Sequence, residues 1–502
     1  MAGPEDSEDD SATMVTPAFA SHQAMSILDL SMDVLVHILS LLQPADVVSA
    51  SQRWLWITLL RKVCDQQTVF KPTFDKMESM SLQELKQAAI TPTRLLDHLK
   101  QCSLSGNTPR TSMRTLTHEP PNFFIDGENT FMLAPGARYL VTCTQTTLSL
   151  WDLGHGAKST FKCCCSTKIA SAESAAFGVF ACQITDLRVA SERHQIPWVS
   201  GKSIYCVYEV FPMNATPNFC TIASASIERF ADISRCSANE IVLAGINGDL
   251  ASTSFIVWNY VVDAWVKWNM EDLAIDLEVI TNAQLHVCNG CVIVLKDDTI
   301  TVYTISGLIP RVDGERPPTI VNKPQASYKL AFKSGCYASA IVTNPWYEAA
   351  TTGNISNYLD ILCKGSDGGQ TALQHCIMRR AGNPADPGSL EVIPTDEILG
   401  GNGFFDLNCV PSTWATPRDL ICVSMGDFGV LANIFTLPSP KPGHESALPF
   451  PEFAIWPLEE LTQDVSQINF CVFSGRICMQ TETLNPLGEH SCAIRILDVI
   501  LP

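Results

Sequence analysis

The sequence predicts an α+β multidomain protein, in which a short N-terminal all-α module precedes a large all-β domain. Two observations support this division. Apolar residues recur at helical spacing from Ile27 to about Gln101, and at a spacing of two residues after about residue 125. Between these parts, residues 103–121 are rich in Ser, Thr, Asn and Pro, which is typical of a linker.

The first helical elements lie close to the N-terminus. Ser31 can cap the first of them, and Pro44 ends it and opens a second short helix. The apolar residues of the first helix recur at helical spacing and are Val34, Leu35, Ile38, Leu39 and Leu42. These residues predict an amphipathic helix followed by a tight helical turn.

Two further helical stretches follow. The third covers Trp54–Val63, and its predicted apolar positions are Trp54, Leu55, Ile57, Leu60 and Val63. The fourth begins after Ser81, where Glu84 three residues later completes a capping-box pattern. Pro92 is expected to interrupt this helix, which then resumes over Thr93–Gln101.

The β domain is predicted to be a β-propeller of about seven blades. Alternating apolar strands recur at roughly the spacing of propeller blades with loop insertions. These strands cover residues 147–153, 203–210, 254–261, 299–305, 358–365, 430–437 and 493–500, and we expect each to close a blade. Asn289–Gly290 further predicts a hairpin turn. A pair of β-sandwiches is the alternative architecture.

These patterns divide the chain into four parts. They are an acidic tail expected to be disordered (1–25), a helical module (26–66), a helical extension with a linker (67–121) and the β-propeller-like domain (122–502). A closed propeller needs its first and last strands in one blade. We therefore expect Cys492–Leu501 to pair with Asn122–Asp126 or the strand after it.

The charge of the chain argues against nucleic acid and anionic membranes as partners. The formal net charge is -19 and the pI is about 4.9, and no basic run is present. Residues 1–119 hold ten Lys and Arg against fourteen Asp and Glu, which leaves 23 and 38 for the rest of the chain. This acidity predicts that a protein bound by the β domain presents a basic or apolar segment rather than a phosphorylated one.

The 20 cysteines are expected to be reduced. They are scattered over apolar stretches, as at Cys143, Cys363 and Cys471, where free cysteine behaves as a small buried hydrophobe. The acidic first residues lack the apolar core of a signal peptide, and no apolar run reaches the length of a membrane span. These features predict a location in the cytoplasm or nucleus.

No motif predicts catalysis, a metal or a cofactor. Cys288 and Cys291 form a single CxxC pair across the expected Asn-Gly turn, whereas a zinc site needs four ligands. Residues 400–405 (GGNGFF) lack the Lys-Ser/Thr ending of a phosphate loop. Trp151-Asp152 is similar to the ending of a WD repeat but occurs once, and His155 is expected in a loop after the last strand of a blade.

The stretch from Leu30 to Ser51 resembles the F-box. The residues that match or replace positions of the family pattern are Leu30, Ser31, Asp33, Val34, Leu35, Ile38, Leu39, Ser40, Leu41, Leu42, Asp46, Val47 and Val48. Ser31 stands where the family has proline, and the segment before Arg53–Trp54 is shorter than in the family. With a β domain behind it, the chain looks like a fungal F-box protein with a C-terminal propeller-like half.

The resemblance implies a substrate receptor of a Skp–cullin–F-box ubiquitin ligase. In that family the F-box docks a Skp-type adaptor, and through it a cullin, while the C-terminal half recruits a protein and performs no chemistry. The adaptor-binding residues would be Leu30, Ser31, Val34, Leu35, Ile38, Leu39, Leu42, Pro44, Val47 and Val48. Two alternatives remain: a propeller scaffold that binds no ligase, and a propeller enzyme with an unrecognised site in its central channel.

Overall fold

The computed structural model describes most of the secondary structure of the chain. The described residues are 38–39, 41–42, 52–66, 69–74, 76–116, 130–143, 147–155, 159–168, 177–180, 187–194, 202–228, 233–236, 239–246, 253–269, 285–288, 290–296, 298–330, 336–342, 358–365, 371–380, 390–399, 412–415, 419–426, 429–436, 453–457, 464–484 and 490–501.

Two helices precede the β domain. Helix α2 covers Arg53–Gln66, and two short 3₁₀ helices, η3 (Lys71–Phe74) and η4 (Met77–Ser79), lead to helix α3 (Leu82–Ser105). The predicted capping box is confirmed, because the Ser81 hydroxyl accepts from the Glu84 amide while the Glu84 carboxylate accepts from the Ser81 amide.

Helix α3 differs from the prediction at Pro92, which lies inside one continuous helix rather than between two. Proline has no N–H for the helical bond to the carbonyl four residues back, which normally disfavours this position. Here the buried face of α3, which includes Leu85, Leu95 and Leu99, packs against the main core and holds the helix together across the missing bond.

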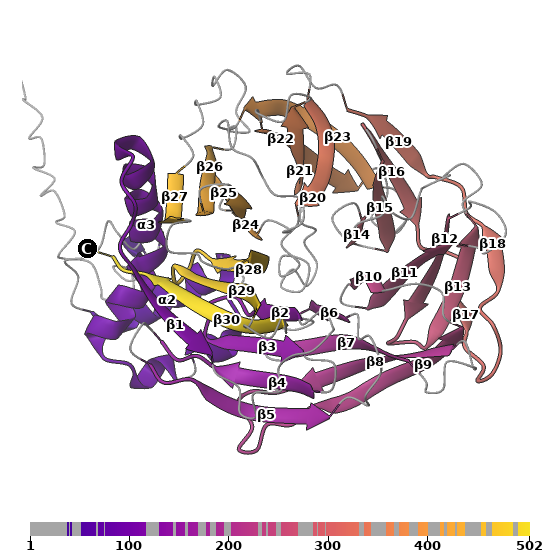
Figure 1. Cartoon of the computed structure of the whole chain (residues 1–502), viewed down its shortest axis with the longest axis horizontal. Coiled ribbons are helices and arrows are strands. Elements are labelled where there is room, and N and C mark those ends of the chain that lie inside the picture. Colours follow the sequence, from indigo (N-terminus) through magenta and orange to yellow (C-terminus); the bar gives the residue numbers. More distant parts are fainter. Residues whose placement is uncertain are drawn as a thin grey trace, which may run out of the picture.

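The described strands form seven sheets, arranged around a ring as a β-propeller (Figure 1). In order along the chain, the first sheet holds β2 (Thr130–Leu133), β3 (Tyr139–Cys143), β4 (Thr147–Asp152) and β5 (Lys162–Lys168). The second holds β6 (Phe177–Phe180), β7 (Leu187–His194), β8 (Lys202–Val210) and β9 (Cys220–Glu228). The third holds β10 (Ile233–Cys236), β11 (Glu240–Ile246), β12 (Thr253–Asn259) and β13 (Ala264–Asn269), and β17 (Ile309–Pro310) and β18 (Thr319–Val321) both pair with β13.

The remaining sheets continue the ring. The fourth holds β14 (Leu285–Cys288), β15 (Cys291–Lys296), β16 (Thr299–Thr304) and β19 (Ala326–Lys329). The fifth holds β20 (Cys336–Val342), β21 (Tyr358–Gly365), β22 (Thr371–Arg380) and β23 (Leu390–Leu399). The sixth holds β24 (Ser412–Ala415), β25 (Asp419–Gly426), β26 (Gly429–Thr436) and β27 (Phe453–Pro457). The last holds β28 (Asp464–Cys471), β29 (Arg476–Leu484), β30 (His490–Val499) and β1 (Thr111–Leu116).

The propeller prediction is confirmed, but the position of its recurring strands is corrected. Each of the seven predicted strands lies in a different sheet, as β4, β8, β12, β16, β21, β26 and β30. None of them is the outermost strand of its sheet, since most are third and β21 is second. Outer strands are more exposed, as the burial of β5 and β19 shows, so their apolar alternation is weaker than that of the strands they cover.

The strand that completes the last sheet also differs from the prediction. Thr111–Leu116, within the segment expected to be a linker, forms β1 and pairs antiparallel with β30, with Thr111 opposite Val499. The expected partner, Asn122–Asp126, lies outside the described residues. The first and last described strands, β1 and β30, therefore share one sheet, with an earlier strand in place of the one expected.

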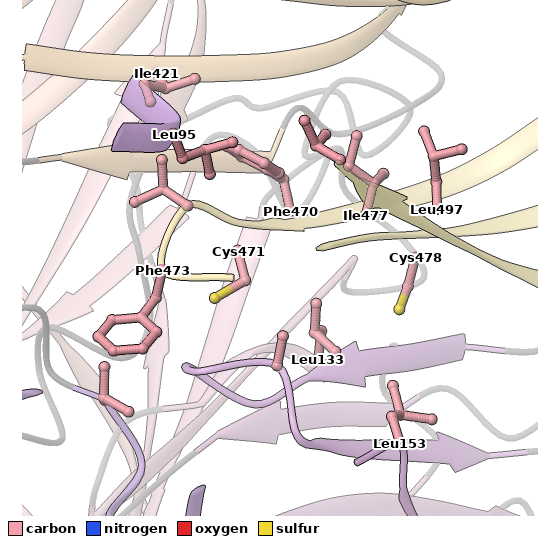
Figure 2. Packing of buried hydrophobic residues seen from close by; sticks show 14 of the residues in the cluster. Leu95, Leu133, Leu153, Ile421, Phe470, Cys471, Phe473, Ile477, Cys478 and Leu497 are labelled. Atoms are coloured by element: carbon pink, nitrogen blue, oxygen red, sulfur yellow. The ribbon is translucent and has the colours of Figure 1, made fainter. Parts of the chain in front are cut away.

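The largest apolar core joins the helices to the ring. It contains buried residues of α2 and α3 together with residues of the first, sixth and last sheets. In Figure 2, Leu95 of α3 lies near Phe470 of β28 and Phe473 of the β28–β29 turn, and Leu133 of β2 and Leu153, which follows β4, lie lower in the view than Leu95 and Phe470. Helices α2 and α3 are thus built into the core at the point where the ring closes.

Candidate docking site at the helix–ring junction

Three of the predicted adaptor-binding residues lie among the described residues: Ile38, Leu39 and Leu42. Ile38 and Leu39 are helical, and the amides of Leu41 and Leu42 donate to the carbonyls of Ile38 and Leu39 at 3.1 and 3.2 Å. The other predicted residues fall outside the described part of the chain, and they are Leu30, Ser31, Val34, Leu35, Pro44, Val47 and Val48.

The described leucines point in different directions. Leu39 is partly buried and packs against the main core, whereas Leu42 is 41% exposed and Leu41 is 67% exposed. Leu39 therefore anchors this segment to its own chain, and Leu41 and Leu42 present apolar surface to solvent.

Two further exposed apolar residues lie on the helices. Trp54 of α2 is 67% exposed and Leu104 of α3 is 69% exposed. The sequence pattern places Trp54 in the apolar stripe, but in the structure Trp56 takes the buried position and Trp54 faces solvent. Since Trp54 and Trp56 are two residues apart on a helix, they cannot share a face.

The segment between α2 and α3 is attached to the first sheet by hydrogen bonds. The Phe70 amide donates to the Pro135 carbonyl at 3.1 Å, and Arg138 donates to the carbonyls of Pro72 and Thr73 at 3.2 and 3.3 Å. Gly136 has φ +91°, and a Cβ there would lie 2.6 Å from Thr73. This close approach requires glycine and fixes the helical segment against the β2–β3 turn.

A buried charge network lies beside this attachment. Arg476 Nε donates to Asp498 Oδ1 at 2.6 Å, and Arg114 of β1 donates to the other oxygen of Asp498 at 2.5 Å. Arg476 also donates to the carbonyls of Ala137, in the β2–β3 turn, and of Gly154, which follows β4, at 2.6 and 3.1 Å. These bonds satisfy a guanidinium that is only 2% exposed and connect the last sheet to the first.

The single Trp-Asp pair takes part in the same junction. The Trp151 indole donates to the Thr142 hydroxyl at 3.0 Å. The Asp152 carboxylate accepts from Arg138 Nη2 at 2.9 Å and from the Gly154 amide at 2.9 Å. Asp152 therefore orients Arg138, which holds the segment between α2 and α3.

His155 follows β4, the third strand of its sheet, and not the last strand as predicted. Its ring stacks on Phe74 with the centroids 5.2 Å apart and an angle of 15° between the planes. Removal from water lowers the pKa of His155, the positive charge of Arg138 lowers it further, and Asp152 acts in the opposite direction. A neutral ring is therefore favoured against Phe74.

The described cysteines form no disulfide, and most of them are buried. Burial raises the pKa of Cys143 to about 12, and burial also raises the pKa of the thiols of Cys471 and Cys478. In the exposed strand β5, Cys163, Cys164 and Cys165 all have raised pKa values, mainly through desolvation. None of these thiols has the lowered pKa of a reactive cysteine.

The CxxC pair lies where a hairpin turn was predicted. Cys288 and Cys291 face each other across the β14–β15 hairpin, with Gly290 at φ +73°, so the predicted turn is confirmed. The stretch 400–405 lies outside the described residues. Over the described part of the chain, no group of three metal-binding side chains comes together, and no helix is long and apolar enough to cross a membrane.

Comparison with known proteins gives structural neighbours only. No protein-family model and no curated protein matches the chain. Among solved structures, the chain is similar to Hsv2 of Kluyvelomyces marxianus, with 9% identity, a TM-score of 0.36, and coverage of 72% of this chain and 96% of that one.

Two other solved structures have similarly low identities and TM-scores. The WD40 domain of SCAP from fission yeast has 8% identity and a TM-score of 0.32, and the match covers 74% of this chain and 81% of that one. A prolyl endopeptidase has 10% identity and a TM-score of 0.31, and the match covers 83% of this chain and 52% of that one. All these TM-scores are below 0.5, so the likenesses carry no argument about what this chain binds.

Proposed function

We propose that this chain is a non-catalytic adaptor, the substrate receptor of a Skp–cullin–F-box ubiquitin ligase. The N-terminal helical segment docks a Skp-type adaptor, and the propeller recruits a protein substrate. The observation that carries the proposal is the pair Leu41 and Leu42, which stands exposed beside the anchored Leu39 within the segment that resembles the F-box. Apolar side chains of such a segment gain free energy when a groove of partner helices covers them.

The fold supports a protein in which the helical part docks the adaptor and the propeller recruits the substrate. Because α2 and α3 share the main core with the first and last sheets, the propeller cannot swing freely relative to the helices. A receptor works by tethering, which raises the effective concentration of the substrate near the ligase. A shared core fixes the direction in which the bound substrate is presented.

We further infer that each of the seven sheets is one blade of a single closed ring. Inner strands of neighbouring sheets contact one another from β2 to β6, from β6 to β10, from β10 to β14, from β24 to β28, and from β28 back to β2. A closed ring leaves no inner sheet edge open and presents loops on two faces for protein recognition.

The docking half of the proposal is tested by charge substitution. Leu42→Asp and Leu35→Asp each place an unpaired carboxylate in the docked surface, and we expect co-purification of the Skp-type adaptor to be lost. Leu104→Asp is the matched control, because Leu104 is an exposed leucine like Leu42 but lies near the end of α3. If the adaptor still co-purifies with both variants, the F-box-like segment is not the docking surface and this half of the proposal fails.

The recruiting half is tested by the charge of the captured proteins. Residues 120–502 carry 23 Lys and Arg against 38 Asp and Glu, so long-range attraction favours a basic or apolar segment over a phosphorylated one. We expect raised salt to reduce the set of captured proteins and phosphatase treatment to leave it unchanged. Loss of capture after phosphatase treatment would contradict this part of the proposal.

A further inference from the structure

The outer edge of the third sheet is covered by a segment that belongs to the fourth. The chain between β16 and β19, residues 305–325, leaves the fourth sheet and lies along β13 (Figure 1). Within it, β17 pairs antiparallel with β13, with Ile309 opposite Trp265. Strand β18 pairs parallel with the same strand, with Ile320 opposite Trp268. We call residues 305–325 the strap.

Side chains as well as backbone bonds fix the strap to the third sheet. Arg311 Nε and Nη2 donate to the two carboxylate oxygens of Asp263 at 2.8 and 3.1 Å. The Cζ atom of Arg311 lies 5.9 Å from the centroid of the Trp265 ring. Leu308 and Ile320 pack against a buried core to which both the third and the fourth sheets contribute. The strap is therefore an ordered part of the fold.

The composition of β13 makes an uncovered edge hazardous. Its residues 264–269 read AWVKWN, and Trp265, Val266 and Trp268 are buried. Aromatic and β-branched residues favour strands, and an apolar strand with an open edge pairs with strands of other chains. By contrast, the outermost strand β5 of the first sheet has no buried residue and begins and ends with lysine, which discourages strand addition.

The strap itself is a poor template for further pairing. Its paired parts are short, since β17 has two residues and β18 has three. Proline lacks the N–H that a sheet ladder needs, and charged or proline-rich edges resist strand addition. The prolines of the strap are Pro310, Pro317, Pro318 and Pro324. The third sheet therefore ends at the strap.

We propose that the strap is an edge cover that keeps two copies of this chain from joining through β13. Without it, β13 of one copy pairs antiparallel with β13 of a second copy, in a twofold contact. In a register centred on Val266, the Lys267 amide donates to the Trp265 carbonyl of the second copy, and no two lysines face each other. The proposal is independent of the ligase proposal, because it rests on other residues.

The ends of the strap meet, so the strap can be removed without breaking the fourth sheet. Val302 of β16 lies opposite Ala326 of β19, and the Gln325 amide donates to the Val302 carbonyl at 2.8 Å. The Thr304 hydroxyl donates to Gln325 Oε1 at 3.0 Å. Replacing residues 306–323 by a short Asn-Gly turn therefore leaves β16 and β19 as a hairpin. In light scattering, we expect the mass of this strap-less chain to rise with concentration above the 54.9 kDa of one copy, while the full chain stays at that mass.

Lys267→Pro separates pairing through the edge from association through exposed core. The Lys267 amide donates to the Pro318 carbonyl of the strap at 2.9 Å, so this N–H points away from β12. Proline is tolerated where the N–H faces outward from an edge strand, and in the strap-less chain it should restore the monomer. Lys267→Ala is the matched control, because it keeps the N–H and should leave the association unchanged. A strap-less chain that stays monomeric, or that associates equally with Lys267→Pro, would overturn the proposal.

A milder variant keeps the test decisive if the strap-less chain does not fold. Replacing residues 309–319 by Gly and Ser at equal length removes β17 and keeps Leu308 and Ile320 in the core. Circular dichroism should show the strand content of the full chain, and light scattering should show weaker association than the deletion causes. Lys267→Pro should again reverse this association. A folded, monomeric variant of this kind would show that the strap does not guard the edge, which contradicts the proposal.

Discussion

Arg476 and Asp498 form a buried ion pair that ties together the two ends of the propeller. They face each other on neighbouring strands β29 and β30, with Nε and Oδ1 2.6 Å apart. Arg114 of β1 shares the same carboxylate, and Arg476 reaches the carbonyls of Ala137, in the β2–β3 turn, and of Gly154, which follows β4. One carboxylate thus orders the three outer strands of the last sheet and, through Arg476, their contact with the first.

Asp498→Asn is expected to destabilise the protein strongly. The substitution leaves Arg476 buried and without its counter-charge, and breaking a buried pair in this way costs about 3–5 kcal/mol of folding free energy. We expect a large fall in the melting temperature, measured by calorimetry or circular dichroism. The matched control is Asp313→Asn, because Asp313 also pairs with an arginine but its side chain is 90% exposed. A similar melting temperature for both variants would show that the network contributes little.

Removal of the last ten residues, 493–502, is expected to cause aggregation. The deletion removes Ile494, Ile496 and Leu497, which are buried in the main core, and leaves β1 and β29 without the strand between them. Exposed sheet edges next to apolar surface associate with other chains. Light scattering should detect large particles, whereas deletion of residues 1–25 should leave the protein monomeric. A C-terminal truncation that melts like the full chain would argue against ring closure by these strands.

The sequence predicts the repeating part of the fold because that part depends on local patterns. One apolar alternating strand per sheet was identifiable, since β4, β12 and their equivalents are covered by neighbours on both sides. The capping box at Ser81 and the turn at Gly290 are equally local, because each is set by residues three or fewer positions apart. These features needed no knowledge of distant contacts.

The features that the sequence does not reveal depend on distant contacts. In the segment Thr111–Leu116, which includes Met113 and Arg114, apolar and polar residues alternate only weakly, so its composition resembles that of a linker. The segment forms a strand only because β30 lies beside it. Helix α3 continues through Pro92 because its other face packs on the core. Arg476 shows no motif at all, since the groups that bind it, in Asp498, Ala137 and Gly154, lie in other parts of the chain.

The reactivity of the thiols should follow their burial. In the native protein, Cys163 and Cys220 are exposed and should react first with a thiol reagent, while Cys471 and Cys478 should be protected. Because burial raises the pKa of Cys163, its reaction should accelerate toward alkaline pH. After unfolding without reductant, we expect nearly all of the 20 cysteines to titrate as free thiols. Several protected pairs in the unfolded protein would contradict a reduced state.

Acidification should weaken the attachment of the helices through His155. The pKa of His155 in the folded protein is lowered, first by removal of the ring from water and then by Arg138, while the unfolded value is about 6.5. Between these two pKa values the unfolded chain binds more protons than the folded one. The free energy of unfolding therefore falls as the pH drops below about 6.5, and it stops falling once the pH is below the folded pKa.

His155→Phe isolates this effect because it removes the titrating group and keeps an aromatic ring to stack on Phe74. Wild-type protein should lose more stability between pH 7 and pH 5 than the variant does, as measured by urea unfolding at each pH. The difference should be modest, since part of the His155 ring stays exposed and Asp152 favours its protonation. Identical losses in the two proteins would mean that other groups, such as carboxylates of the ring, determine the sensitivity to acid.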